Sequence, residues 1–130
     1  MEKRPGCRRR HPRYLVDANL DARIEFGYPR TEDPTCAMKL KDVSDGGLGF
    51  VLPHELPGLE VGDSIDRVEI HVGARAVRGD LLVMHFSPDA SAGSVCGAFF
   101  YPAADEDLLA FREILRDLEA SSSGVPTASR

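Results

Sequence analysis

Two short segments of this 130-residue chain carry side chains that could bind an anionic, nitrogen-rich ligand. The first runs from Arg8 to Arg13 and contains four arginines, a histidine and a proline. A guanidinium forks onto phosphate oxygens, forks equally well onto the O6 and N7 edge of guanine, and stacks flat on a base. Pro12 restricts its own backbone and favours an extended residue before it. We therefore expect Arg9 and Arg13 to lie on a stiffened stretch of chain.

The second segment, DVSDGG at residues 42–47, combines carboxylates, a hydroxyl and two glycines. The Asp42 carboxylate can accept both the N1–H and the N2–H of a guanine, and Ser44 offers a hydroxyl beside it. Gly47, which follows Gly46, would let the backbone approach a ligand where a Cβ would collide. The same residue types are expected in an ordinary hairpin turn, and the arginines could equally form a solubilising tail.

Other chemistry has weaker support in the sequence. Ser44 lies two residues from Asp42, but no histidine is near it along the chain, so no nucleophile and base are paired. His71 and His85 fall in expected strands, where a satisfied or exposed imidazole is commoner than a metal ligand. The chain also lacks a phosphate-binding loop motif. We therefore predict no enzyme activity, no catalytic residue, no bound metal and no cofactor.

Alternating apolar and polar residues predict the strands that must position these groups. In residues 20–28 the apolar side chains occupy the even-numbered positions and the charged side chains occupy odd-numbered ones. This alternation is typical of a strand with one buried face and one solvent-exposed face. Similar patterns predict the remaining strands, at residues 36–42, 48–52, 68–72, 74–86 and 95–101. We expect Gly79 and Asp80 to interrupt the strand at residues 74–86 as a turn or bulge, and residues 95–101 to be buried on both faces.

The segments between these strands and after them have a different character. Residues 53–63 and 87–93 are rich in loop residues. Acidic side chains at 105–107 precede apolar residues spaced three and four apart up to Leu118, which predicts one amphipathic helix. Several short strands followed by one helix indicate a mainly β fold, a small antiparallel barrel that the helix plugs or flanks. The absence of alternating strands and helices excludes a dinucleotide-binding βαβ fold.

Charge is distributed unevenly along the chain. Residues 1–13 hold six basic side chains and one acidic side chain, a net charge of +5, whereas the whole chain carries −5. The remaining residues, 14–130, therefore carry −10, so a basic arm precedes an acidic body. Such a body would repel long polyanions while the arm attracts a small anion.

Composition also bears on the compartment. No apolar run is long enough to span a membrane, and the basic N-terminal residues precede no apolar stretch of a secretory signal. Three cysteines without CxxC spacing favour neither a disulfide scaffold nor a four-ligand zinc site. Cys36 and Cys96 have the pattern of small buried hydrophobic residues. We expect a cytoplasmic protein without membrane insertion.

The order and spacing of the two motifs resemble those of a known family. Arg9-x-x-x-Arg13, a strand, and then Asp42-x-Ser44-x-x-Gly47 about thirty residues later are similar to the PilZ domain, the bacterial receptor for cyclic di-GMP. The PGLEVGDSI loop, the GAFF strand and the closing helix are also similar, so that the resemblance covers residues 8–119.

The resemblance implies a six-stranded antiparallel β-barrel that holds its ligand on the outside. The arginine segment would cross the ligand, and the second motif would form the facing wall. Carried over by position, the cyclic di-GMP-binding residues would be Arg8, Arg9, Arg13, Asp42, Ser44, Gly46 and Gly47. Arg8 just before the motif would favour a stacked pair of ligand molecules over a single one. The arm would be mobile without ligand and ordered with it.

The same resemblance implies a small adaptor that binds cyclic di-GMP and relays the signal to an unidentified effector protein, in motility, exopolysaccharide or biofilm control. One alternative is a PilZ-like protein-interaction module that binds no nucleotide. Another is a small barrel that binds RNA or single-stranded DNA, which the acidic body and the 7% aromatic content disfavour. The expected organisation is a basic arm (1–13), a barrel with its helix (14–119) and a disordered tail (120–130).

Overall fold

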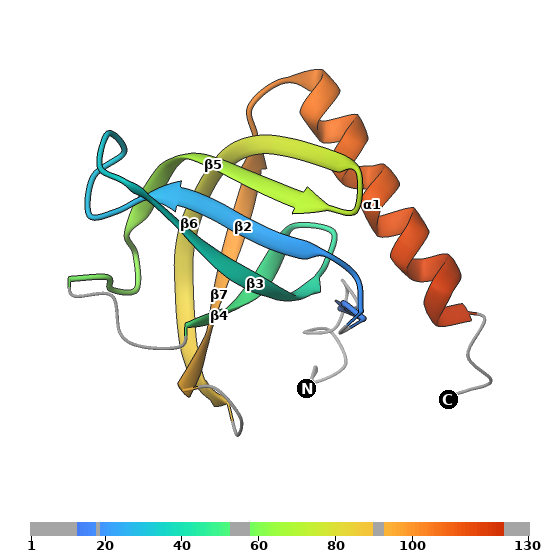
Figure 1. Ribbon diagram of the computed structural model, residues 1–130, viewed down its shortest axis with the longest axis horizontal. Coiled ribbons are helices and arrows are strands. Elements are labelled where there is room, and N and C mark those ends of the chain that lie inside the picture. The colour runs from blue at the N-terminus through green and yellow to red at the C-terminus, as the bar shows by residue number, and fades with distance from the viewer. Residues whose placement is uncertain (1–12, 18, 53–57, 90–92, 124–130) are drawn as a thin grey trace, which may run out of the picture.

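A computed structural model of the chain describes residues 13–17, 19–52, 58–89 and 93–123. This part of the chain forms strands followed by one C-terminal helix (Figure 1). The elements are β1 (Tyr14–Leu15), β2 (Ala22–Gly27), β3 (Thr35–Val43), β4 (Gly47–Leu52), β5 (Ser64–Val72), β6 (Arg75–Asp89), β7 (Gly93–Pro102) and α1 (Asp105–Ser123).

Six of these strands close into an antiparallel barrel. The neighbours run in the order β3, β2, β5, β6, β7, β4, and pairing of β4 with β3 closes the ring. The short β1 adds to the edge of β3, where Tyr14 pairs with Val43 and Leu15 with Asp42. The predicted fold class, a six-stranded antiparallel barrel with one C-terminal helix, is confirmed.

The alternation of apolar and polar residues along the strands corresponds to the inner and outer faces of the barrel wall. In β2, Ala22, Ile24 and Phe26 point inward and are buried, whereas Arg23 and Glu25 point outward. Inward residues of the other strands complete one core. Its largest fully buried side chains are Phe26, Phe50, Phe111, Ile24, Leu40, Ile70, Leu81, Ile114, Val43, Val68, Val77 and Val83.

Two bulges break this alternation on one side of the barrel. In β3 the pairing with β4 shifts between Leu40 and Asp42. Leu40 and Val43 are both fully buried in the core, so two residues between them, not one, must face outward. In β6 a similar shift lies between Val83 and His85. Each bulge therefore adds an outward-facing side chain at the same side of the barrel.

Helix α1 lies along one end of the barrel, on the right in Figure 1. Phe111, Ile114 and Leu118 join the barrel core, and the Phe111 ring lies 5.0 Å from that of Phe100 between centroids. Three acidic residues occupy its first turn, where the helix dipole favours negative charge. Among the described residues, no helix combines the length and the apolar character needed to cross a bilayer.

The predicted interruption at Gly79 and Asp80 is wrong, because β6 continues through both residues. A Cβ at Gly79 would lie 2.3 Å from the carbonyl oxygen of Tyr101, so glycine allows β6 and β7 to approach closely here. The irregularity lies on the partner strand instead. In β5 the register shifts between Ile65 and Val68, and Arg67 adopts a φ of 58°.

Other boundaries also differ from the sequence predictions. The loop predicted at residues 87–93 is shorter, because β6 extends to Asp89 and β7 begins at Gly93. Strand β7 is buried on both faces only over residues 95–98, since Phe99 is 44% exposed. Helix α1 continues through residues 120–123, which the prediction assigned to the tail. The arm up to residue 12 and the tail from residue 124 lie outside the described residues.

Candidate functional site

A pocket of about 520 Å³ lies on the outer face of the barrel, on the side of the two bulges. We call it the outer pocket. Its lining comes from the residue before β1, the β3–β4 hairpin and the facing parts of β6 and β7. The lining residues are Arg13, Asp42, Ser44, Gly46, Gly47, Leu48, Met84, His85, Gly97, Ala98 and Phe99.

The outer pocket brings together residues of both sequence motifs. All the predicted site residues that the structure describes line it, namely Arg13, Asp42, Ser44, Gly46 and Gly47. Arg8 and Arg9 lie outside the described residues. The end of the arginine motif and the hairpin motif therefore share one pocket, although about thirty residues separate them along the chain.

Arg13 reaches the pocket because β1 pairs with the end of β3. Tyr14 lies opposite Val43, which brings the preceding residue alongside the hairpin. The Arg13 side chain is exposed, and among the described residues no carboxylate forms an ion pair with it. Its guanidinium is available to an anionic ligand.

Asp42 is the buried acidic residue of the described chain, only 6% exposed. The β3 bulge turns it to the outer face, where its carboxylate lies over Gly49 of β4. A Cβ at Gly49 would lie 3.0 Å from Oδ1. Within the described ranges, no donor forms a hydrogen bond or ion pair with this carboxylate. Burial of a charged acceptor without a donor is costly, so this carboxylate has capacity to accept hydrogen bonds from a molecule in the pocket.

The β3–β4 hairpin is held in place by main-chain hydrogen bonds. The Ser44 amide donates to the Gly47 carbonyl at 2.8 Å, and the Gly47 amide donates to the Ser44 carbonyl at 3.4 Å. The Phe100 amide donates to the Gly46 carbonyl at 3.0 Å, which fixes the turn to β7. The pocket edge formed by this turn is therefore part of the rigid sheet.

The two hairpin glycines have different roles. A Cβ at Gly47 would lie 2.4 Å from the carbonyl oxygen of Ala98, so the close approach that Gly47 permits is between β4 and β7. Our sequence interpretation assigned that approach to a ligand. A Cβ at Gly46 would meet nothing within 4 Å. Gly46, not Gly47, is thus the glycine with open space at the pocket.

The sequence analysis missed the second wall of the pocket, which Met84, His85 and Phe99 provide from β6 and β7. The His85 ring lies over Gly97, where a Cβ would be 2.3 Å from its Nε2. The one sequence signal was the Phe99–Phe100 pair, since adjacent strand residues point to opposite faces and one ring must therefore face outward.

The pocket offers recognition groups more than catalytic ones. The hydroxyl of Ser44 donates to the Gly47 carbonyl at 3.4 Å and, within the described residues, makes no hydrogen bond to His85. Cys96 points into the core, and burial raises the pKa of its thiol to about 12, so it is no nucleophile at neutral pH. A guanidinium, a buried carboxylate and an aromatic ring suit a ligand that has anionic groups and a planar donor-bearing heterocycle.

Comparison with known proteins identifies the family and the fold of the chain. A family model described as PilZ domain matches residues 8–115. No match was found among curated protein sequences.

Several solved structures are similar in fold. The MrkH–c-di-GMP complex from K. pneumonia aligns with a TM-score of 0.74 at 19% identity, covering 95% of this chain and 54% of that one. The PilZ domain of Escherichia coli YcgR with c-di-GMP has a TM-score of 0.70 at 19% identity, covering 90% and 95%. The Bacillus subtilis inhibitor of motility MotI/DgrA has a TM-score of 0.62 at 17% identity, covering 98% and 55%. The chain thus spans about half the length of MrkH and MotI.

Proposed function

The chain belongs to the PilZ domain family, and on that premise we propose that it binds cyclic di-GMP in the outer pocket and acts as a small adaptor. The observation that carries the proposal is the buried Asp42 carboxylate, without a donor among the described residues, in the same pocket as Arg13. Guanine presents N1–H and N2–H donors side by side, which one carboxylate can accept together.

The other pocket residues have complementary parts in this proposal. Arg13 contacts a phosphate or the O6 and N7 edge of a guanine, and we assign the same role to Arg8 and Arg9 from the sequence motif. Phe99 and Met84 offer apolar surface to a purine ring. A volume of about 520 Å³ lies within the usual range for small-molecule sites.

We propose that the bound state is read by an effector protein and that the domain performs no reaction itself. Similar structures are described as a c-di-GMP-dependent transcription regulatory factor and an inhibitor of motility, which supports motility control as an output. Exopolysaccharide and biofilm control are further outputs that we propose from the sequence resemblance alone. A reducing cytoplasm fits cysteines without disulfide spacing.

Calorimetric titration of the full chain with cyclic di-GMP tests this function. Arg13→Ala removes charge-assisted hydrogen bonds worth about 1.5–3 kcal/mol, so affinity falls roughly 10- to 100-fold. Arg112→Ala, an exposed arginine on α1, is the matched control and leaves affinity unchanged. If the wild-type protein releases no heat, or if Arg13→Ala binds as tightly as wild type, the proposed site is wrong.

Cyclic di-AMP provides a second test of the Asp42 role. Adenine has no N1–H and no N2 amino group, so it leaves the buried carboxylate without its donors. We expect cyclic di-AMP to bind at least about tenfold more weakly than cyclic di-GMP. Equal affinity for the two dinucleotides would contradict guanine recognition by Asp42.

A further inference from the structure

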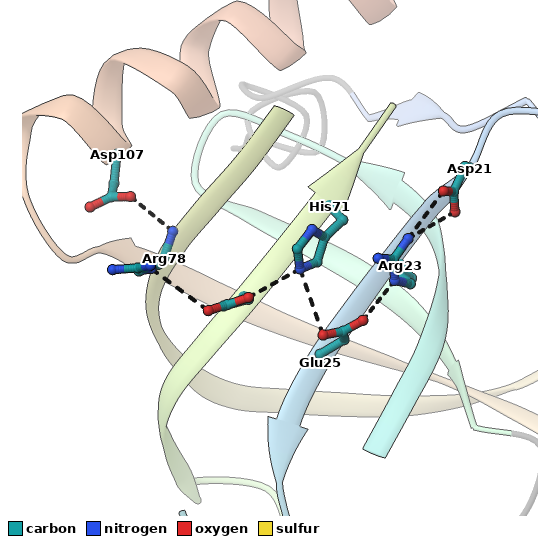
Figure 2. Close-up of polar contacts among 7 residues, drawn as sticks. Asp21, Arg23, Glu25, His71, Arg78 and Asp107 are labelled. Carbon is teal, nitrogen blue, oxygen red and sulfur yellow. Dashed lines mark hydrogen bonds and ion pairs between the residues drawn. The ribbon is translucent and has the colours of Figure 1, made fainter. Parts of the chain in front are cut away.

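A row of charged side chains crosses the outer face of β2, β5 and β6 (Figure 2). In the barrel order, the β2–β5 pair lies on the side opposite the β4–β7 pair that bears the outer pocket. Glu25 of β2 lies directly opposite Glu69 of β5, and Arg23 lies opposite His71. Residues 44 and 48 positions apart in the chain are thus adjacent in the sheet.

Three potential ligand atoms converge at the centre of this row. His71 Nε2 lies 3.1 Å from Glu69 Oε1 and 3.6 Å from Glu25 Oε1, and all three atoms lie within 4.8 Å of one another. A tetrahedral zinc ion with bonds of about 2.0–2.2 Å places neighbouring ligand atoms roughly 3.3–3.6 Å apart. The three side chains are half-buried. Glu25 lies on β2 and the other two lie on β5, so regular strands hold their positions.

An arginine lies beside the Oε2 atom of each glutamate. Arg23 Nε donates to Glu25 Oε2 at 2.7 Å, and Arg78 Nε lies 3.7 Å from Glu69 Oε2. The Oε1 atom of each glutamate is therefore the one that faces His71. Arg23 is held in turn by Asp21, and the hydrogen bonds to Glu25 and Asp21 raise the pKa of its guanidinium. Such outer partners commonly fix the first ligands of a metal.

The charges of the row favour an added cation. Two carboxylates directly opposite on neighbouring strands repel each other. With Asp21 included, three carboxylates accompany the two guanidinium groups of Arg23 and Arg78. An ion between Glu25 and Glu69 would remove the repulsion and link the two strands.

We propose that Glu25, Glu69 and His71 form a binding site for a divalent transition-metal ion, best matched by Zn²⁺, with a fourth coordination position open to solvent. Sequence analysis predicted no metal at His71, because an imidazole in a strand is more often satisfied or exposed than a ligand. The register of β2 on β5 brings Glu25 beside it, which no pattern within one segment shows. The alternative is an ion-pair network of Glu25, Glu69 and His71 that holds no metal, and the experiments below separate the two.

Calorimetric titration of the full chain with Zn²⁺ is the first test. We expect one site that His71→Gln and, separately, Glu69→Gln weaken at least tenfold. His85→Gln, which changes a histidine of the outer pocket, is the matched control and retains the zinc affinity. Equal zinc affinity in wild type and His71→Gln, or no zinc binding by wild type, would leave only the ion-pair network.

Co²⁺ spectroscopy distinguishes this site from adventitious binding to the cysteines. Nitrogen and oxygen ligands give weak visible bands, whereas a thiolate adds intense sulfur-to-metal charge transfer. We expect the weak bands alone, lost in His71→Gln and retained in His85→Gln. Thiolate bands that persist in His71→Gln would overturn the proposal.

Zinc should also stabilise the fold, because it binds the native arrangement of two strands. Saturating Zn²⁺ is expected to raise the thermal midpoint of wild type and His85→Gln but not of His71→Gln. A shift of the same size in all three proteins would contradict the assignment. These readouts do not depend on cyclic di-GMP, so failure of the metal site and failure of the nucleotide site remain distinguishable.

Discussion

At the scale of single residues, the binding role that we propose for Asp42 is opposed to the stability of the fold. Its carboxylate is buried, and among the described residues no donor satisfies it. A charge in this position destabilises the ligand-free fold. In the proposed function, a ligand that supplies two N–H donors would regain that free energy on binding, so Asp42 would contribute strongly to guanine recognition.

Asp42→Asn is expected to separate stability from binding. Removal of the charge should leave the free energy of unfolding unchanged or raise it by about 1 kcal/mol, because a neutral amide is cheaper to bury. Affinity for cyclic di-GMP should fall at least about tenfold. Urea unfolding and calorimetry measure the two effects, and Asp66→Asn, an exposed residue of β5, should change neither. An unfolding free energy that falls together with the affinity would mean that Asp42 is structural.

Cys96 gives a prediction about pH. Burial raises its pKa from an ordinary value of 9.0 to about 12, which lowers the thiolate fraction at pH 9. Each unit of this shift is a tenfold reduction in thiolate, so alkylation of native Cys96 should be slow even at pH 9. Mass spectrometry should find the half-buried Cys36 modified before Cys96. Modification of Cys96 as fast as Cys36 would contradict its place in the core.

The raised pKa of Cys96 also makes the free energy of unfolding depend on pH. Above pH 9 the unfolded thiol releases its proton while the folded one keeps it until about pH 12. The unfolded state then binds fewer protons than the native state, so the free energy of unfolding falls as pH rises through this range. Cys96→Ala should reduce this alkaline slope in urea unfolding experiments.

At the scale of elements, substitution of the two adjacent glycines in the β3–β4 hairpin is expected to have different effects on the stability of the fold. Gly47→Ala places a Cβ against the Ala98 carbonyl and should destabilise the fold by about 1–3 kcal/mol. Gly46→Ala meets open space and should change stability by less than about 0.5 kcal/mol. Urea unfolding of the two variants measures the difference. Equal stability would mean that β4 and β7 do not need their close approach.

The helix is expected to contribute to the barrel core through one face. Phe111→Ala removes a fully buried ring packed on Phe100 and should destabilise by about 3–5 kcal/mol. Leu109→Ala lies on the exposed face, at 62% exposure, and should cost less than about 0.5 kcal/mol. Similar losses in the two variants would show that α1 does not pack as described.

At the scale of the whole molecule, charge should decide between a dinucleotide and a polynucleotide. Residues 14–130 carry a net charge of −10, which repels long polyanions even where the basic arm attracts them. We expect single-stranded RNA and DNA to compete poorly with cyclic di-GMP in fluorescence competition at low salt. Preference for oligonucleotides, with steep salt dependence, would instead support the nucleic-acid-binding alternative.

Much of the fold could be predicted from patterns within single strands and within the helix. The buried face of a strand follows from the alternation around Ile24 and Phe26. The buried face of the helix follows from the apolar stripe through Phe111 and Leu118, because both patterns repeat over a few neighbouring residues. The arginine and Asp-x-Ser motifs predicted a class of ligand through the chemistry of their side chains, and this stays a prediction for the titrations to test.

The tertiary structure decided which groups meet. In an unbroken strand Asp42 would share the inward parity of Leu40, and only the bulge against β4 turns it to the outer pocket. Met84 and His85 reach the opposite wall through a second bulge. Glu25 meets His71 only through the register of β2 on β5. Such positions depend on pairing between distant segments, which a pattern confined to one segment does not contain.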